Sequence, residues 1–151
     1  LVGSEMCIRD SYTFNASDFV NAVKENKASL AVICSPNNPT GTKISMADIE
    51  YVAKNIDCAL VIDEAYVEFD GESAMRFLKD YPHLMIARTF SKAYGLASAR
   101  VGYLLADKKI IEMVGKACMP YHVNVLSVIT ADIVYQMRDE YIPRIQMTVA
   151  E

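Results

Sequence analysis

Three separate segments of the chain contain side chains whose types and spacing could support chemistry. They are Ser35-Pro-Asn-Asn-Pro-Thr-Gly41, Val61-Ile-Asp-Glu-Ala-Tyr66 and Arg88-Thr-Phe-Ser-Lys-Ala-Tyr-Gly-Leu-Ala-Ser-Ala-Arg100. Together they supply an amine, a carboxylate, a phenol, an amide and groups of the kind that bind phosphate. This is the set needed to hold and use pyridoxal 5′-phosphate (PLP), an aldehyde cofactor with a phosphate tail.

Lys92 is the candidate catalytic residue. It lies between a strand of buried type and a turn that contains Gly95. A lysine becomes nucleophilic when burial or nearby cations lower its pKa, and it can then form a Schiff base with an aldehyde. Once a substrate amine has displaced it, the freed amine can move a proton between substrate and cofactor carbons. A lone lysine would indicate only a surface residue, so the interpretation depends on its neighbours.

Asp63, Tyr66 and Asn38 are the candidates for contacts with the cofactor ring. Asp63 ends an apolar strand, and it could keep a pyridine nitrogen protonated, cap a helix or pair with a cation. Tyr66 could bind the phenolic oxygen of the cofactor. Tyr66 and Asp63 can contact the same cofactor ring only if the strand ends near Glu64 and the chain bends. Asn38 could bind the same oxygen or simply form a turn, and the Asn38–Pro39 bond is a candidate for the cis form.

Ser91 and Arg100 are the candidate phosphate ligands. A guanidinium offers a two-pronged fork to phosphate oxygens, and a serine offers a hydroxyl donor. Either residue alone would be unremarkable.

The cysteines and histidines do not predict a metal site. No two cysteines form a Cys-x-x-Cys pair, and neither His83 nor His122 lies at ligand spacing from a cysteine. We therefore expect packing or surface roles for the histidines, and reduced thiols in a cytoplasmic protein.

The elements that must position these residues follow an alternating pattern. We expect strands at 29–34, 59–63, 84–88 and 101–106, each continuously apolar, and helices at 14–24, 45–55, 73–80, 108–118 and 123–141, the last broken or kinked by Pro143. This pattern predicts an α/β fold with a mostly parallel sheet covered by helices on both faces. Asn38, Asp63 and Lys92 follow three strand ends, where α/β sheets place their ligands.

Composition narrows the class of partner. The 151 residues are 52% hydrophobic and 23% charged, with a formal net charge of −4, as in an ordinary globular protein. Mild acidity argues against nucleic acid or an anionic membrane as partner, and no apolar run reaches the roughly 18 residues that span a bilayer.

The three ordered segments, with Arg100-Val-Gly-Tyr103, resemble the fold-type-I PLP-dependent aminotransferases of class I/II, and within them the histidinol-phosphate aminotransferases. The segment Pro120-Tyr-His-Val-Asn124 is also similar to the one that precedes the interdomain helix of that family. One departure is Ala97-Ser-Ala-Arg100, where relatives usually have a glycine.

The resemblance implies a role for each candidate. Lys92 would be the Schiff-base lysine and Asp63 the partner of the pyridine nitrogen, while Tyr66 and Asn38 would contact the phenolic oxygen. The phosphate would lie on the remaining two candidates, Ser91 and Arg100. The resemblance also implies a homodimer. Its reaction would transfer an amino group from a small-molecule donor to a keto acceptor in histidine biosynthesis.

The same resemblance divides the chain. Residues 1–11 resemble the translation of a common sequencing adapter, 12–122 part of the large PLP-binding domain, and 123–151 the interdomain helix. The N-terminal phosphate-binding turn and the C-terminal small domain of the family are not found in the sequence, so we expect the chain by itself to be inactive. The alternatives are a decarboxylase of the same fold acting on threonine phosphate, another class I/II aminotransferase, a non-catalytic binding module, and a fragment that does not fold stably.

Overall fold

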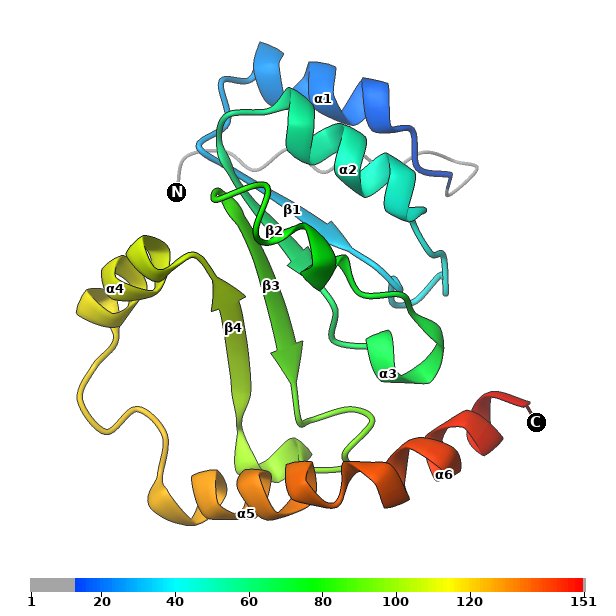
Figure 1. Ribbon diagram of the computed structural model, residues 1–151, viewed down its shortest axis with the longest axis vertical. Coiled ribbons are helices and arrows are strands. Elements are labelled where there is room, and N and C mark those ends of the chain that lie inside the picture. The colour runs from blue at the N-terminus through cyan, green and yellow to red at the C-terminus, as the bar shows by residue number, and fades with distance from the viewer. Residues whose placement is uncertain (1–12, 151) are drawn as a thin grey trace.

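The computed structural model describes residues 13–150, so the expected adapter-derived segment 1–11, including Cys7, lies outside the described residues. Helices and strands alternate along most of the chain (Figure 1). The elements are α1 (Ala16–Glu25), β1 (Leu30–Cys34), α2 (Met46–Asn55), β2 (Ala59–Asp63), α3 (Val67–Asp70), the 3₁₀ helix η1 (Ala74–Phe77), β3 (Leu84–Thr89), the 3₁₀ helix η2 (Ala97–Ala99), β4 (Gly102–Ala106), α4 (Lys108–Ala117), α5 (Val125–Gln136) and α6 (Arg138–Ala150).

The four strands form one sheet in the order β1-β2-β3-β4. The first three run parallel and β4 is antiparallel to β3, which confirms the expected mostly parallel α/β sheet. Cys34 pairs in register with Asp63, and Asp63 with Ala87. The carboxyl ends of β1, β2 and β3 therefore meet at one edge of the sheet.

Helices α1 and α2 cover one face of the sheet, as Figure 1 shows. Their apolar sides enclose a continuous core with the strand residues that point towards them, among them Ile33, Leu60, Ile62 and Ile86. This burial, worth about 25 cal/mol per Å² of apolar surface, is the main term that holds the described fold together. Ser45 caps the N-terminus of α2: its hydroxyl accepts from the backbone N–H of Asp48 at 3.0 Å and donates to the Asp48 carboxylate at 2.7 Å.

The expectation that every strand is buried on both faces is wrong for β1. Ala31 and Ile33 are buried, whereas Leu30 and Val32 are 54% and 50% exposed. A continuous apolar run identifies a strand but does not show what covers each side of it. β3 behaves as expected at its start, where Leu84, Met85 and Ile86 are all buried.

Two expected helices differ in the structure, and one short helix was not expected. The segment 73–80 contains a 3₁₀ helix over Ala74–Phe77, and the short α3 directly after Tyr66 was not expected. The helix expected over 123–141 is divided at Met137 into α5 and α6, and Pro143 lies inside α6. Proline disturbs the turn that precedes it. Here the interruption falls upstream, where the N–H of Glu140 donates to the carbonyl of Met137 in a tightened turn.

Candidate active site

The chain bends directly after β2, and Asp63 lies close enough to Tyr66 to act on the pKa of its phenol. The strand ends at Asp63, whose Oδ1 accepts a hydrogen bond from the N–H of Ala65 at 3.0 Å. The carbonyl of Glu64 then accepts from Val67, and Tyr66 starts α3. This is the early strand ending that the sequence required if both side chains were to face one ring.

Tyr66 is joined to Asn38, which lies on the loop after β1. The amide Nδ2 of Asn38 donates to the Tyr66 hydroxyl at 2.6 Å, and the Asn38–Pro39 bond is cis. Because the Tyr66 oxygen accepts here, its own O–H is available to a further acceptor. An amide and a phenol thus converge on one point from two strand ends.

Lys92 lies above the same phenol. Its Nζ is 5.2 Å from the centre of the Tyr66 ring, and a turn closed by the N–H of Gly95 and the carbonyl of Lys92, with Gly95 at φ +68°, carries it. The pKa of Tyr66 is lowered, chiefly by its hydrogen bond to Lys92 and further by Asn38, while partial desolvation and Asp63 oppose the shift. Tyr66 is therefore coupled to three other predicted site residues: Asn38, Asp63 and Lys92.

Cys34 is a site residue that the sequence analysis missed. Its Sγ lies 3.9 Å from Oδ2 of Asp63. Cys34 is exposed, but partial desolvation and the Asp63 carboxylate raise the pKa of the thiol, so Cys34 faces the carboxylate as a neutral group. The available signal was its place at the end of the first strand, level with Asp63 at the end of the second.

The candidate phosphate ligands Ser91 and Arg100 each bond to a residue a few positions away in the chain. Ser91 is half-buried, and its N–H donates to the hydroxyl of Thr89 at 3.0 Å. Arg100 is exposed and left-handed at φ +55°, with Nη1 donating to the carbonyl of Ala97 at 3.0 Å. Within residues 13–150 no hydrogen bond joins the two side chains. A left-handed arginine costs of order 1–3 kcal/mol, and such backbone outliers cluster at functional sites.

A buried ion pair between Glu64 and Arg88 was also missed. Glu64 is 1% exposed, and its Oε2 accepts from Nη2 of Arg88 at 2.8 Å and from Nε at 3.0 Å. Strand alternation could have revealed it: Leu60, Ile62 and Glu64 point to the same covered face, and a carboxylate there needs a cation.

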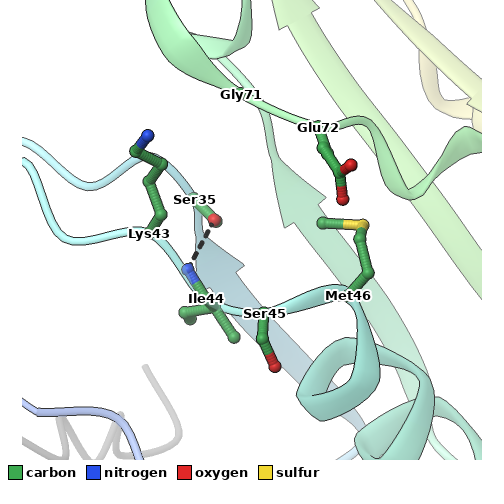
Figure 2. Close-up of a pocket in the computed structure, with 7 residues that line it drawn as sticks. All are labelled: Ser35, Lys43, Ile44, Ser45, Met46, Gly71 and Glu72. Atoms are coloured by element: carbon green, nitrogen blue, oxygen red, sulfur yellow. Dashed lines mark hydrogen bonds between the residues drawn. The ribbon is translucent and has the colours of Figure 1, made fainter.

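The pocket drawn in Figure 2 is separate from these residues. It has a volume of about 270 Å³ and is lined by Ser35, Lys43, Ile44, Ser45, Met46, Gly71 and Glu72. Ser35 is buried and its hydroxyl accepts from the N–H of Ile44 at 3.0 Å, the dashed line in Figure 2. None of the predicted cofactor or catalytic residues lines it.

The donor set at the strand ends fits PLP. The Tyr66 phenol and the Asn38 amide can bind the same oxygen of a ring, and the Lys92 amine lies next to them. The carboxylate of Asp63, at the end of β2, acts on the same phenol. These are the groups that an aldehyde-bearing pyridine ring requires.

Residues 5–149 of the chain match the sequence profile described as aminotransferase class I and II. The chain belongs to this family. The match begins within the segment expected to derive from an adapter, so the origin of residues 1–11 stays a prediction. The aminotransferase resemblance and the fold class inferred from the motifs are confirmed.

Three relatives within the family carry the same name, histidinol-phosphate aminotransferase. The histidinol-phosphate aminotransferase of Bifidobacterium longum is 40% identical over 150 residues, covering 89% of this chain and 39% of that protein. Histidinol-phosphate aminotransferase 1 of Carboxydothermus hydrogenoformans is 40% identical, covering 97% and 42%. The Sinorhizobium meliloti histidinol-phosphate aminotransferase, solved with pyridoxal-5′-phosphate, superposes with a TM-score of 0.81 at 30% identity, covering 90% and 38%. The chain thus spans about two fifths of the length of these relatives.

Between residues 13 and 150 no helix is long and apolar enough to cross a membrane. In the same range, no three His, Cys, Asp or Glu side chains gather as metal ligands would.

Proposed function

We propose that the protein containing this chain transfers an amino group between histidinol phosphate and 2-oxoglutarate, giving imidazole-acetol phosphate and glutamate in histidine biosynthesis. The observation that carries the proposal is the convergence of Asn38, Tyr66 and Lys92 at the ends of β1, β2 and β3. The substrate is supported by the relatives that share 40% identity.

Each residue has a distinct task in this proposal. When bound, PLP would supply a reactive aldehyde and an electron-withdrawing ring. Lys92 would hold the cofactor by its aldehyde, and its amine would move the proton that the transfer requires. Asp63 would keep the pyridine nitrogen protonated, and Tyr66 would donate its O–H to the ring oxygen with Asn38 beside it. Ser91 and Arg100 would bind the phosphate.

The remaining properties follow the family. We propose a homodimer in the cytoplasm, with a small-molecule amino donor and keto acceptor as its only substrates. Because the chain spans about two fifths of the relatives' length, we also propose that the 151 residues alone bind PLP weakly and do not turn over substrate.

The test uses the protein expressed from its complete reading frame. We expect PLP to become fixed to Lys92, so that borohydride reduction followed by peptide mapping finds the cofactor on that residue. Lys92→Ala should abolish both the fixation and the visible absorbance, while Lys116→Ala on the exposed side of α4 should change neither. An unchanged spectrum after PLP is added to folded wild-type protein would refute the proposal.

Substrate assays separate the competing reactions. Glutamate with imidazole-acetol phosphate should give 2-oxoglutarate. Release of carbon dioxide from threonine phosphate would instead identify a decarboxylase of the same fold. Activity with other keto acids, but not with imidazole-acetol phosphate, would identify another class I/II aminotransferase.

A further inference from the structure

The carboxylate of Glu64 closes the loop that carries Tyr66. Its backbone leads into the loop, while Oε1 accepts from the N–H of Ala74 at 2.7 Å and Oε2 from the hydroxyl of Ser73 at 2.9 Å, at the far end of the same loop. Both ends of the segment 64–74 are thus attached to one buried side chain.

Arg88 attaches this closed loop to the strand that leads to Lys92. Besides its two bonds to Glu64, Nη2 of Arg88 donates to the hydroxyl of Ser73 at 2.8 Å. Tyr103, the register partner of Arg88 on β4, also helps to raise the pKa of the guanidinium. Burial alone would lower the pKa of Arg88, but these hydrogen bonds outweigh it and raise the pKa, so the guanidinium stays charged.

The contacts give the carboxylate of Glu64 and the hydroxyl of Ser73 partners in the cluster. The Ser73 hydroxyl donates to Glu64 and accepts from Arg88 and from the N–H of Met75. Among the described residues, no buried side-chain nitrogen or oxygen lacks a partner. A fully satisfied buried network has one low-energy arrangement and therefore fixes the elements that it joins.

We propose that Glu64, Arg88 and Ser73 are positioning residues that set where Tyr66 and Asp63 lie relative to Lys92. The proposal rests on the proposed function for its consequence in cofactor binding, but not for its geometry. Glu64 follows Asp63 directly and lies two residues before Tyr66, and Arg88 lies four residues before Lys92. The ion pair is a buried side-chain link between the two segments.

The decisive variants separate position from stability. Glu64→Gln and Arg88→Lys each disturb the pair while keeping its size, and the double variant Glu64→Leu with Arg88→Met replaces both charges with apolar groups. Removing one partner of a buried pair destabilises a fold, whereas replacing both is often neutral. Glu112→Gln, which removes an exposed ion pair with Lys108, is the matched control.

The first measurement is the titration of the Tyr66 phenol in cofactor-free protein, by NMR of ring-labelled tyrosine with Tyr66→Phe for assignment. Lys92, Asn38 and Asp63 all act on this phenol. We expect its pKa to rise towards the ordinary tyrosine value in Arg88→Lys and in the double variant, because Lys92 is no longer held beside it. The control should titrate like the wild type.

The second measurement is the affinity for PLP in the protein from its complete reading frame. We expect a loss of roughly tenfold or more in both variants, even where the double variant melts at the wild-type temperature. Wild-type phenol titration and PLP affinity in Arg88→Lys and in a folded double variant would overturn the inference. If wild-type protein binds no PLP, the proposed function fails, and the phenol titration still decides the inference.

Discussion

The amide of Asn38 donates a 2.6 Å hydrogen bond to the hydroxyl of Tyr66, although 28 positions separate the two residues. The bond joins the loop after β1 to the turn after β2, and Lys92, from the segment after β3, lies over the same ring. Three strand ends are therefore coupled through one phenol, whose titration reports on the whole site.

The phenol should respond to its neighbours in a fixed order. A nearby ammonium stabilises phenolate, so removing it in Lys92→Ala should raise the pKa of Tyr66. Asn38→Ala should raise it by less, because the Lys92 hydrogen bond is the largest cause of the lowered value. NMR titration of ring-labelled tyrosine measures both shifts. Equal effects, or a larger effect of Asn38, would contradict the arrangement, and Asn55→Ala on α2 is the control.

Cys34 should titrate under the control of Asp63. Burial and the carboxylate both raise the pKa of the thiol above its ordinary value of about 9.0. Asp63→Asn should therefore lower the pKa of the thiol, though not to its ordinary value, since the partial desolvation remains. The pH dependence of alkylation by iodoacetamide, in a variant with the other three cysteines replaced by serine, measures the shift. PLP should protect Cys34 if it binds against Asp63, and alkylation at an unchanged rate would argue against that placement.

The same thiol predicts a direction for stability against pH. Because the folded pKa lies above the unfolded one, the unfolded chain loses its proton first as the pH rises. The contribution of Cys34 is thus fully present below about pH 9.0 and is lost as the pH rises through the folded pKa. Urea unfolding of wild type and Cys34→Ser between neutral and alkaline pH should show a smaller alkaline loss in the variant.

Two leucines on neighbouring strands should differ sharply in their effect on stability. Leu60 is fully buried beneath α1 and α2, whereas Leu30 is 54% exposed. Leu60→Ala should lower the free energy of unfolding by about 2–5 kcal/mol, and Leu30→Ala by less than about 1 kcal/mol. Urea denaturation of the 151-residue chain compares the two. Similar losses would mean that the outer face of β1 is covered in solution.

Arg100 should act on the phosphate and not on the ring. Arg100→Lys keeps a positive charge but loses the two-pronged donor, so PLP affinity should fall by roughly tenfold, about 1.4 kcal/mol. Affinity for pyridoxal, which carries no phosphate, should stay the same. Titrations with the two compounds distinguish these effects, and a parallel loss for both would assign Arg100 a structural role.

The residues that converge at the strand ends were predictable because the rule behind them is general. Parallel strands place their carboxyl ends at one edge, so Asn38, Asp63 and Lys92 could be brought together from strand assignments alone. The bend after Asp63 was predictable as a condition, because Tyr66 could reach the same ring in no other way.

What escaped prediction depended on contacts between distant segments. Glu64 pairs with Arg88 and Ser73, and sequence alone does not show which cation will meet a buried carboxylate. The exposed side of β1 escaped for a similar reason, since Leu30 and Val32 are as apolar as their buried neighbours. The helix ends at Met137 although no proline or glycine lies there to indicate an end.

The attachment of Glu64 at both ends of its loop restricts insertions and deletions more than substitutions. Residues 67–72 connect Tyr66 to Ser73, and the Glu64 side chain holds the two ends of this loop together. An insertion or a deletion in this crossing would therefore displace the Tyr66 phenol. A side chain at Gly71 would force a shift, because a methyl group there would come within 2.8 Å of the Val67 side chain. In homologues that keep both Glu64 and Arg88, the number of residues in this crossing should be constant while the exposed side chains along it vary.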